Sequence, residues 1–503
     1  MNRVLIMSHQ CLRVVAVLAA TLLLGCASLR VADTTALSPS QLAPPGSETI
    51  SNDGYRLDAV TRQGELSDLL VLVAMSGGGK RSAAFAYGVL KGMRDVPIPF
   101  AGGDRPLLNE LDGISGISGG SFTAAYYGLY RDRMFGQYEK DFLYSDTNSY
   151  IFGIYLLPWN WGWIANPKVG TNDYMEHVYD ETMFHGATYK DLKALGRPII
   201  AIGATDINYG NPFIFTQEVF DVICSDLTNF PLARAVAASN GFPGLFSPVT
   251  LTNRAADCGG RIPGWERRVT AEQRRDPLSR LGAQANLLDR YLDPRRTRYV
   301  HLADGGVSDN LGLRVAGAMM QNLAQSPTSI AQLGYDHLRR ILLISVDGQG
   351  AQDSSVAQHE SVGGLFSLFG LVSGGQIDRY NFETLNTVTT QLQDIVRSIG
   401  TARCAQGRVV HGSACDDVQG KLVHISLASM PDGLEKSELL AIPTGLSLQA
   451  HDVDLLVAAG QAAVTTSESL RRFLDEYPAR PPDRAPPRER ARKSGLTAQI
   501  GGR

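Results

Sequence analysis

The stretch LDGISGISGGS, residues 111–121, decides the fold that we expect for this chain. Its apolar first part has the character of a buried strand and meets Ser118, and a helix-like pattern follows from Phe122 to Tyr130. Gly116 and Gly120 lie two residues before and after the serine, where a Cβ atom would collide with neighbouring backbone. This G-x-S-x-G pattern predicts a sharp strand-to-helix turn that presents one hydroxyl. Ser118 is therefore a candidate nucleophile.

The G-x-S-x-G pattern has one rival serine and one alternative explanation. The neighbouring Ser115 also follows a glycine by two residues, but Ile117 stands where the second glycine is needed. A chain with 52 glycines also produces G-x-S-x-G by chance, so an ordinary Gly/Ser turn is the alternative. The pattern needs support from the rest of the chain.

A second glycine loop follows the apolar run of residues 69–75, which predicts a buried strand. Residues 76–82 read SGGGKRS and lead into a helical pattern. Backbone N–H groups at such a helix N-terminus favour an anion. This loop matches neither of two nucleotide-binding motifs. A P-loop requires glycine where Ala74 stands and Ser or Thr where Arg81 stands. A dinucleotide-binding fingerprint requires glycine where Ser82 stands.

A third loop, Asp304-Gly305-Gly306, follows a predicted strand at residues 299–303. In open α/β sheets, ligands bind beyond the carboxyl ends of the strands. We therefore expect the three glycine loops to converge at one edge of a sheet. Further strands are predicted at residues 198–204, 211–215, 340–347 and 421–427, and a helix at residues 233–239.

Two segments are predicted as insertions. Residues 134–179 are crowded with aromatic side chains, which favours a lid or lipid-interface patch and core packing equally. Residues 253–298 are charged and aperiodic. A Gly/Ser loop is expected at residues 349–375, before helical stretches at 380–399 and 453–477.

The N-terminal segment predicts an exported protein. Arginines precede an apolar stretch at residues 14–24, which is too short to span a bilayer but suits a secretory signal. The ending Leu-Leu-Gly-Cys resembles a bacterial lipobox, so residues 1–25 are expected to be a lipoprotein signal peptide and Cys26 the lipidated anchor. A plain signal peptide is the alternative. Residues 26–60 are predicted to be a flexible tether, and residues 478–503 a disordered basic tail.

Export changes what the cysteines indicate. Beyond Cys26 and the signal, four remain, and an even number in an oxidising compartment favours disulfides. Cys404 and Cys415 bracket a polar loop, which favours this pair and leaves Cys224 with Cys258. Four buried free thiols are the alternative. No Cys/His spacing indicates zinc and no oxygen-rich loop indicates calcium, so we expect no metal and no cofactor.

The composition supports a globular protein of this kind. Of 503 residues, 44% are hydrophobic and 19% charged, which indicates a core without general disorder. The formal net charge of −3 gives no indication of nucleic acid as a partner.

The order and the sequences of the three loops resemble those of the patatin-like phospholipase family, in a bacterial lipoprotein form. The resemblance covers roughly residues 69–347 and weakens onward to about 475. It implies a three-layer α/β/α sandwich with a mainly parallel central sheet, forming a catalytic domain at residues 61–477. The motifs are met by Gly77, Gly78, Gly79 and Arg81 (with Ser82 replacing a final glycine), by Gly116, Ser118 and Gly120, and by Asp304, Gly305 and Gly306.

The resemblance also implies a mechanism. Ser118 attacks an ester carbonyl while Asp304 accepts its proton directly, without a histidine. Backbone N–H groups of Gly77–Gly79 and of Gly119 would hold the oxyanion. Arg81 would support that loop, meet a lipid phosphate or form a structural salt bridge. Asp309 is expected to be a turn carboxylate.

We therefore expect a lipid acyl hydrolase of the phospholipase A or lysophospholipase type in the bacterial cell envelope, anchored in the outer membrane and facing the periplasm. Membrane lipids would be both substrate and anchor surface, and no protein partner is indicated. One alternative is an α/β-hydrolase with a Ser-Asp-His triad. Another is a tethered binding protein on an idle hydrolase fold. The downstream histidines are His337, His359, His411, His424 and His451.

Overall fold

The computed structural model describes residues 31–32, 34–57, 68–99, 104–157, 169–321, 330, 334–350 and 365–477. The predicted signal peptide, Cys26 and the basic tail from residue 478 lie outside these residues, as do Trp159, Trp161 and Trp163 of the aromatic segment. Among the described helices, none combines the length and the hydropathy that crossing a membrane requires.

A mainly parallel sheet lies at the centre of the molecule. Its inner strands are apolar and buried along their whole length, as expected for strands covered on both faces. The strands follow the order β1 (Val31–Ala32), β10 (Val249–Thr252), β11 (Tyr299–Ala303), β7 (Ile199–Asp206), β6 (Leu111–Ile117), β3 (Leu69–Met75), β12 (Arg340–Asp347) and β15 (Gln419–Ser426), and β8 (Asn211–Ile214) pairs with β7.

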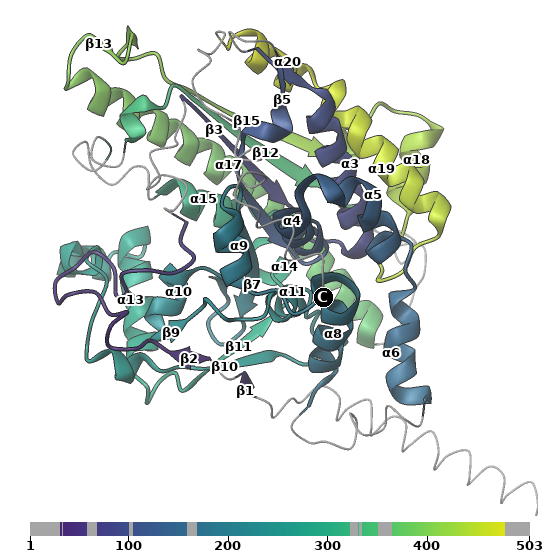
Figure 1. The fold of residues 1–503 in the computed structure, drawn as a ribbon, viewed down its shortest axis with the longest axis horizontal. Helices are drawn as coiled ribbons and strands as arrows, with labels where there is room; N and C mark the ends of the chain where they lie inside the picture. The colour runs from purple at the N-terminus through teal and green to yellow at the C-terminus, as the bar shows by residue number, and fades with distance from the viewer. Residues whose placement is uncertain are drawn as a thin grey trace, which may run out of the picture.

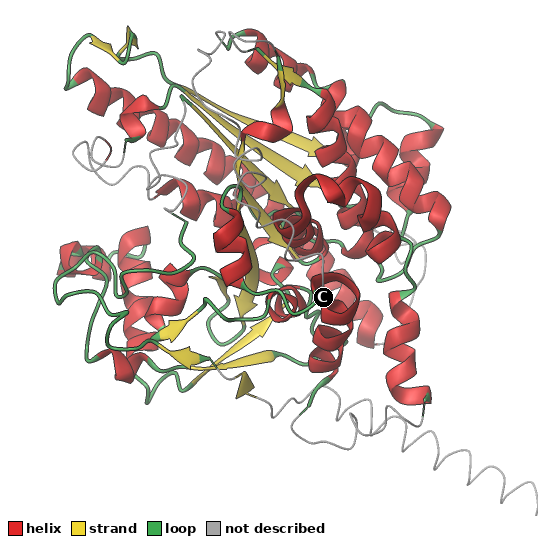
Figure 2. Ribbon diagram, viewed as in Figure 1, coloured by secondary structure: helices red, strands yellow, loops and turns green. Residues whose placement is uncertain are grey.

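Helices cover both faces of the sheet, which gives three layers (Figure 1). One layer contains α3 (Gly79–Asp95), which packs against α19 (Ala450–Thr465) and α4 (Gly119–Tyr130). The opposite layer contains α15 (Leu313–Gln321) and the 40-residue α17 (Leu365–Cys404), which pack against each other. Figure 2 shows the strands enclosed between these helices. The predicted three-layer α/β/α sandwich is confirmed.

Shorter elements complete the chain. They are α5 (Met134–Tyr138), α6 (Thr147–Leu156), α8 (Thr171–Tyr179), α9 (Tyr189–Leu195), α10 (Gln217–Val222), α11 (Leu232–Ser239), α12 (Ala271–Arg275), α13 (Arg280–Leu292), α14 (Gly306–Asp309), α18 (Leu434–Ala441) and α20 (Glu468–Asp475), with the strand pairs β2 (Thr35–Ala36) and β9 (Ser225–Asp226), β4 (Pro97–Ile98) and β5 (Arg105–Pro106), and β13 (Val409–Val410) and β14 (Ser413–Ala414).

The strand that carries Asp304 reaches the sheet edge in an unexpected direction. β11 runs antiparallel to β7 and pairs only with its last two residues, Leu302 with Asp206 and Ala303 with Thr205. The chain therefore runs against the direction of the parallel strands and turns near the carboxyl end of β7, beside the end of β6. The three glycine loops do converge, although β11 does not belong to the parallel set.

The first described segment differs from the predicted flexible tether. Residues 34–57 pack against the domain: β2 pairs with β9, and Leu37 and Ile50 pack around Cys224 and Cys258. Arg56 forms a buried ion pair with Asp221. The Ser, Thr and Pro content suggested a linker, but this composition also suits a turn-rich strap with a few apolar anchors. We call residues 34–57 the strap.

Both cysteine pairs form disulfides, Cys224 with Cys258 and Cys404 with Cys415.

Two helical predictions need correction. The expected Gly/Ser loop at 349–375 ends early, because α17 already begins at Leu365. The expected helix at 453–477 is two helices, α19 and α20, because Ser467 caps a new helix.

Candidate active site

Ser118 lies in a strained turn between β6 and α4. Its backbone has φ 47° and ψ −119°, a conformation that non-glycine residues rarely adopt. Its N–H donates to the Ser239 hydroxyl at 2.9 Å, and that hydroxyl donates to the Gly203 carbonyl at 2.6 Å. The strain is therefore held by a buried hydrogen-bond chain from the neighbouring helix end.

The turn also needs glycine after the serine. A Cβ atom on Gly119 would lie 2.0 Å from the Gly79 carbonyl oxygen, so only glycine allows this contact. The elbow and the Gly77–Gly79 loop are thus packed backbone to backbone.

Asp304 is the direct partner of Ser118. The Ser118 hydroxyl donates to Asp304 Oδ2 at 2.9 Å, and the Gly306 N–H donates to Asp304 Oδ1 at 2.7 Å. Both side chains are almost fully buried. Burial raises the pKa of Asp304 from 3.8 to about 6, against the opposing effect of these two hydrogen bonds. A carboxylate with this pKa is a better proton acceptor than an exposed one.

Asn240 is a site residue that the sequence did not single out. Its Oδ1 lies 3.3 Å from the Ser118 hydroxyl, and its Nδ2 donates to the Tyr179 hydroxyl at 3.2 Å. The serine hydroxyl has only one proton, so we assign its hydrogen bond to Asp304 Oδ2, which is the nearer acceptor. Asn240 directly follows the predicted helix at residues 233–239, and only the folded chain brings it to Ser118.

The oxyanion loop differs from the prediction at its first glycine. The Gly77 N–H donates to the Asn310 carbonyl at 2.8 Å, so this N–H is not available to an oxyanion. The N–H groups of Gly78, Gly79 and Gly119 have no acceptor within the part of the chain that the structure describes. The last two begin helices, whose first N–H groups lack intrahelical acceptors. These three donors form the candidate oxyanion hole.

Arg81 supports the oxyanion loop from behind. It is buried, and its Nε and Nη1 donate to the carbonyls of Gly348 and Ile442, each at 2.8 Å. A buried guanidinium that holds two carbonyls does not reach a lipid phosphate at the surface. Ser82, which replaces the motif's last glycine, donates to the Ser76 carbonyl at 2.6 Å. The helix tolerates its side chain because Gly348 lies opposite.

Lys80, between the last motif glycine and Arg81, is another residue that the sequence did not indicate. Its ammonium binds the Ser145 carbonyl and hydroxyl and lies 4.9 Å from the centre of the Phe142 ring. Burial lowers its pKa from 10.5 to about 7. The oxyanion loop is therefore tied to the start of the aromatic segment.

No histidine hydrogen-bonds to Ser118 or Asp304 within the described residues. His424 bonds the Ser345 hydroxyl on a neighbouring strand, and His411 bonds Asp336. His359 lies outside the described residues. Asp309 accepts from two N–H groups at the start of α15, which fits the expected turn carboxylate.

The aromatic segment contains both buried and exposed side chains. Its side chains at Tyr138, Phe142, Tyr174 and Tyr179 are buried in the core. Others, on and near α6, face solvent; they are Tyr144, Tyr150 and Phe152. Between these two groups lies a cavity of about 250 Å³, whose wall includes Phe142, Tyr150 and Tyr179.

Exposed apolar side chains lie close in sequence to residues of the site. Phe242 and Leu245 are 41% and 47% exposed, in the loop whose Gly241 carbonyl accepts from the Asp304 N–H. Val307, three residues after Asp304, is 54% exposed. Solvent-exposed apolar side chains are therefore carried by the two segments that contain Asn240 and Asp304.

These features define an α/β/α protein with a serine elbow, an adjoining glycine loop and an aspartate partner. A sequence model of the patatin-like phospholipases matches residues 73–316, a range that contains all three loops. The chain therefore contains a patatin-like phospholipase domain.

Solved structures of human GIVD cytosolic phospholipase A2 are similar to this chain at low identity. One, in complex with methyl gamma-linolenyl fluorophosphonate, is 13% identical with a TM-score of 0.35, and the match covers 84% of this chain and 63% of that one. Another is 11% identical with a TM-score of 0.36, covering 84% of this chain and 66% of that one. The chain thus spans less than two thirds of the length of these proteins. A comparison with curated proteins finds no match.

Proposed function

We propose that this protein is a lipid acyl hydrolase that cleaves carboxylic esters through Ser118 and Asp304. The observation that carries the proposal is the 2.9 Å hydrogen bond from the Ser118 hydroxyl to Asp304 Oδ2, at a strained elbow inside a patatin-like domain. A serine whose proton already points at a buried carboxylate is arranged for attack on a carbonyl.

The reaction follows from this geometry in two halves. Asp304 takes the proton as Ser118 Oγ bonds to the ester carbon, and the tetrahedral oxyanion is held by N–H groups of Gly78, Gly79 and Gly119. Asp304 then returns the proton to the leaving alcohol, which gives an acyl-serine. Asp304 next takes a proton from a water that attacks the acyl carbon, and gives it to Ser118 Oγ as the bond to the acyl group breaks and the fatty acid leaves. Each oxyanion donor contributes on the order of 3 kcal/mol to the transition state.

The surroundings support a lipid substrate of the phospholipase A or lysophospholipase type. Phe242, Leu245 and Val307 are exposed apolar side chains on the segments that carry Asn240 and Asp304, and we place the acyl chains against them; exposed aromatic side chains on α6 add to the apolar surface. A polar substrate would gain nothing from these apolar side chains.

We also propose that the protein is anchored through acylated Cys26 in the outer membrane of a bacterial envelope, facing the periplasm. The lipobox-like ending before Cys26 motivates this, and two disulfides suit an oxidising compartment. Mass spectrometry of the amino-terminal peptide tests it: a triacylated Cys26 is expected, and an unmodified terminus at another residue would contradict it.

The test of function is ester hydrolysis by the purified protein, on nitrophenyl esters and on phospholipid vesicles. Ser118→Ala and Asp304→Asn should each lose at least about 10³-fold in kcat/KM while keeping the native circular dichroism. An organophosphorus reagent should label Ser118 in the unmodified protein only. Full activity in Asp304→Asn would favour a triad instead, and absence of both labelling and hydrolysis would favour a binding protein on an idle fold.

A further inference from the structure

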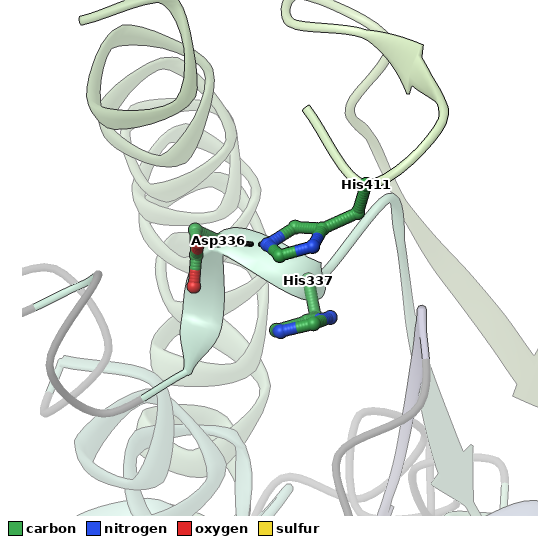
Figure 3. Close-up of side chains that lie close together, drawn as sticks. All are labelled: Asp336, His337 and His411. Carbon is green, nitrogen blue, oxygen red and sulfur yellow. Dashed lines mark hydrogen bonds and ion pairs between the residues drawn. The ribbon is translucent and has the colours of Figure 1, made fainter. Parts of the chain in front are cut away.

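Three potential metal ligands meet far from the Ser–Asp pair. Asp336 and His337 lie in the 3₁₀ turn Tyr335–His337 before β12, and His411 lies in the tight turn between β13 and β14 (Figure 3). His411 lies 74 residues after His337 in the sequence, so no local spacing could predict the cluster. The expectation of no metal rested on the absence of such spacing.

The donor atoms of these side chains already lie close together. Each side chain offers one atom, and these atoms all lie within 4.8 Å of one another. His411 Nε2 is 2.9 Å from Asp336 Oδ2, and the two imidazole rings are stacked with centroids 3.5 Å apart. A tetrahedral ion with bonds of about 2.0–2.1 Å needs donors about 3.4 Å apart. The donor atoms therefore need to move closer by up to about 1.4 Å to enclose an ion.

A rigid frame holds the two segments that carry the donors. The fully buried Arg403 donates to the Asp336 carbonyl at 2.6 Å and, on the other segment, to the Cys415 carbonyl at 3.0 Å and the Ala414 carbonyl at 3.1 Å. The Cys404–Cys415 disulfide closes the base of the hairpin. Preorganised ligands bind metal more tightly because less motion is lost on binding.

Access and charge also suit a cation. Both histidines are exposed, whereas Asp336 is buried. The carboxylate pairs with His411 and accepts from Gln406 Nε2 at 3.3 Å, and the guanidinium of Arg403 bonds the Asp336 backbone and not its carboxylate. In metal sites, a ligating carboxylate is usually hydrogen-bonded by a residue that does not itself bind the metal, and Gln406 has this position.

We propose that Asp336, His337 and His411 form a binding site for one divalent transition-metal ion of the zinc class. Two imidazoles and one carboxylate suit Zn²⁺, whereas Ca²⁺ and Mg²⁺ prefer oxygen ligands. Three protein ligands leave a further position for water. The ion would fasten the disulfide hairpin to the turn that precedes β12.

The site would act on stability and not on catalysis. It lies at the amino ends of β12 and β15, whereas the oxyanion loop follows the carboxyl end of β3, which runs parallel to β12. The eight residues of β12 separate the two edges of the sheet by about 25 Å. An ion that binds only the folded state raises the apparent stability by mass action.

The experiment is a zinc titration of the chelator-treated protein, purified without a histidine tag. We expect one equivalent of Zn²⁺ to bind at micromolar concentration or tighter, to raise Tm, and to leave ester hydrolysis unchanged. Co²⁺ in place of zinc should give the visible absorption of a four-coordinate site. The variants are His337→Asn, His411→Asn and Asp336→Asn, each expected to weaken binding at least tenfold. Asparagine is chosen at His411 because this residue has φ 48°, which asparagine tolerates.

The matched control is His451→Asn. His451 also pairs with a carboxylate, Glu438, at 3.4 Å, but without a third ligand. It should leave zinc binding unchanged. The proposal fails if no equivalent binds at 100 µM zinc, or if His337→Asn and His411→Asn, both folded by circular dichroism, bind as tightly as the unmodified protein. Binding lost only in His451→Asn would also overturn it, because it would identify an ordinary surface histidine.

Discussion

Asp304 must be ionised to accept the Ser118 proton, so the state of one carboxyl sets the pH dependence of the reaction. Its pKa is raised by burial to about 6, and the base form is lost as pH falls through that value. We predict that kcat/KM is constant above pH 7 and falls about tenfold per pH unit well below pH 6. Initial rates on a soluble ester between pH 4.5 and 8.5 check this. A flat profile between pH 5 and 7 would contradict the assignment of Asp304 as the base.

Burial of the Asp304 carboxyl also lowers the stability of the folded state at neutral and higher pH. Its pKa is raised on folding from 3.8 to about 6, so the folded state gains protons relative to the unfolded state, and stability is lost as pH rises through this window. The difference corresponds to at most about 3 kcal/mol at pH 8. We predict that Asp304→Asn is inactive yet more stable than the unmodified protein at pH 8, with the gain disappearing near pH 4.

Urea unfolding at pH 8 and pH 4 measures this difference. Ser118→Ala is the informative control, because it removes one hydrogen bond to Asp304 and leaves the buried charge in place. It should be inactive without any gain in stability. Equal stabilisation by both variants would show that the buried charge is not the cause.

At this scale the sequence predicted the reacting pair but not all of its surroundings. Ser118 and Asp304 carry local motifs that a reader of the sequence can recognise. The Gly77 N–H bond to the Asn310 carbonyl and the contact of Asn240 with Ser118 are tertiary, between segments more than 100 residues apart. No local pattern encodes such a bond. This is why Gly77 was wrongly expected among the oxyanion donors.

At the scale of elements, the elbow and the oxyanion loop depend on each other. The Gly119 Cα lies against the Gly79 backbone, and an added Cβ would meet the Gly79 carbonyl oxygen at 2.0 Å. We predict that Gly119→Ala pushes the two loops apart, which displaces two oxyanion donors and lowers kcat by about 10²–10³-fold with a smaller effect on KM. Steady-state kinetics on a soluble ester measures both parameters.

Gly136→Ala is the matched control for this prediction. Gly136 lies in α5, and an added Cβ would meet nothing within 4 Å. Alanine there should preserve activity and slightly raise stability, because glycine is a poor helix former. If Gly119→Ala kept full activity, the backbone contact of the two loops would not matter for the reaction.

Elements buried on both faces were predictable, whereas composition misled elsewhere. β3 and β12 have the bounds that their apolar runs predict, because nothing but a central strand suits such a run. The start of α17 was missed because Ser373, Gly374 and Gly375 favour a loop, yet the helix passes through them. Low helix propensity at three positions therefore does not end this 40-residue helix.

At the scale of the whole molecule, the strap changes how the protein would sit at a membrane. A flexible tether from residue 26 to 60 could place the domain far from the bilayer. The strap is instead packed on the domain, and β1 already pairs with β10 at Val31. Val31 lies five positions after Cys26, and a fully extended chain of five residue steps reaches about 18 Å. A lipid on Cys26 would therefore hold the domain close to the membrane surface.

We predict that this short reach matters for lipid substrates and not for soluble ones. A 20-residue helical spacer of the EAAAK type, inserted after Ala27, adds about 30 Å. In the lipidated protein reconstituted into vesicles, it should lower the rate on lipids of the same bilayer several-fold, because the exposed apolar side chains of Phe242 and Val307 would meet the bilayer less often. The rate on a soluble ester should not change. A flexible Gly/Ser spacer of equal length is the control and should lower the lipid rate less, since it can fold back. Equal lipid rates in all three proteins would mean that the domain reaches its substrate without the anchor, and the closeness enforced by β1 would have no role in catalysis.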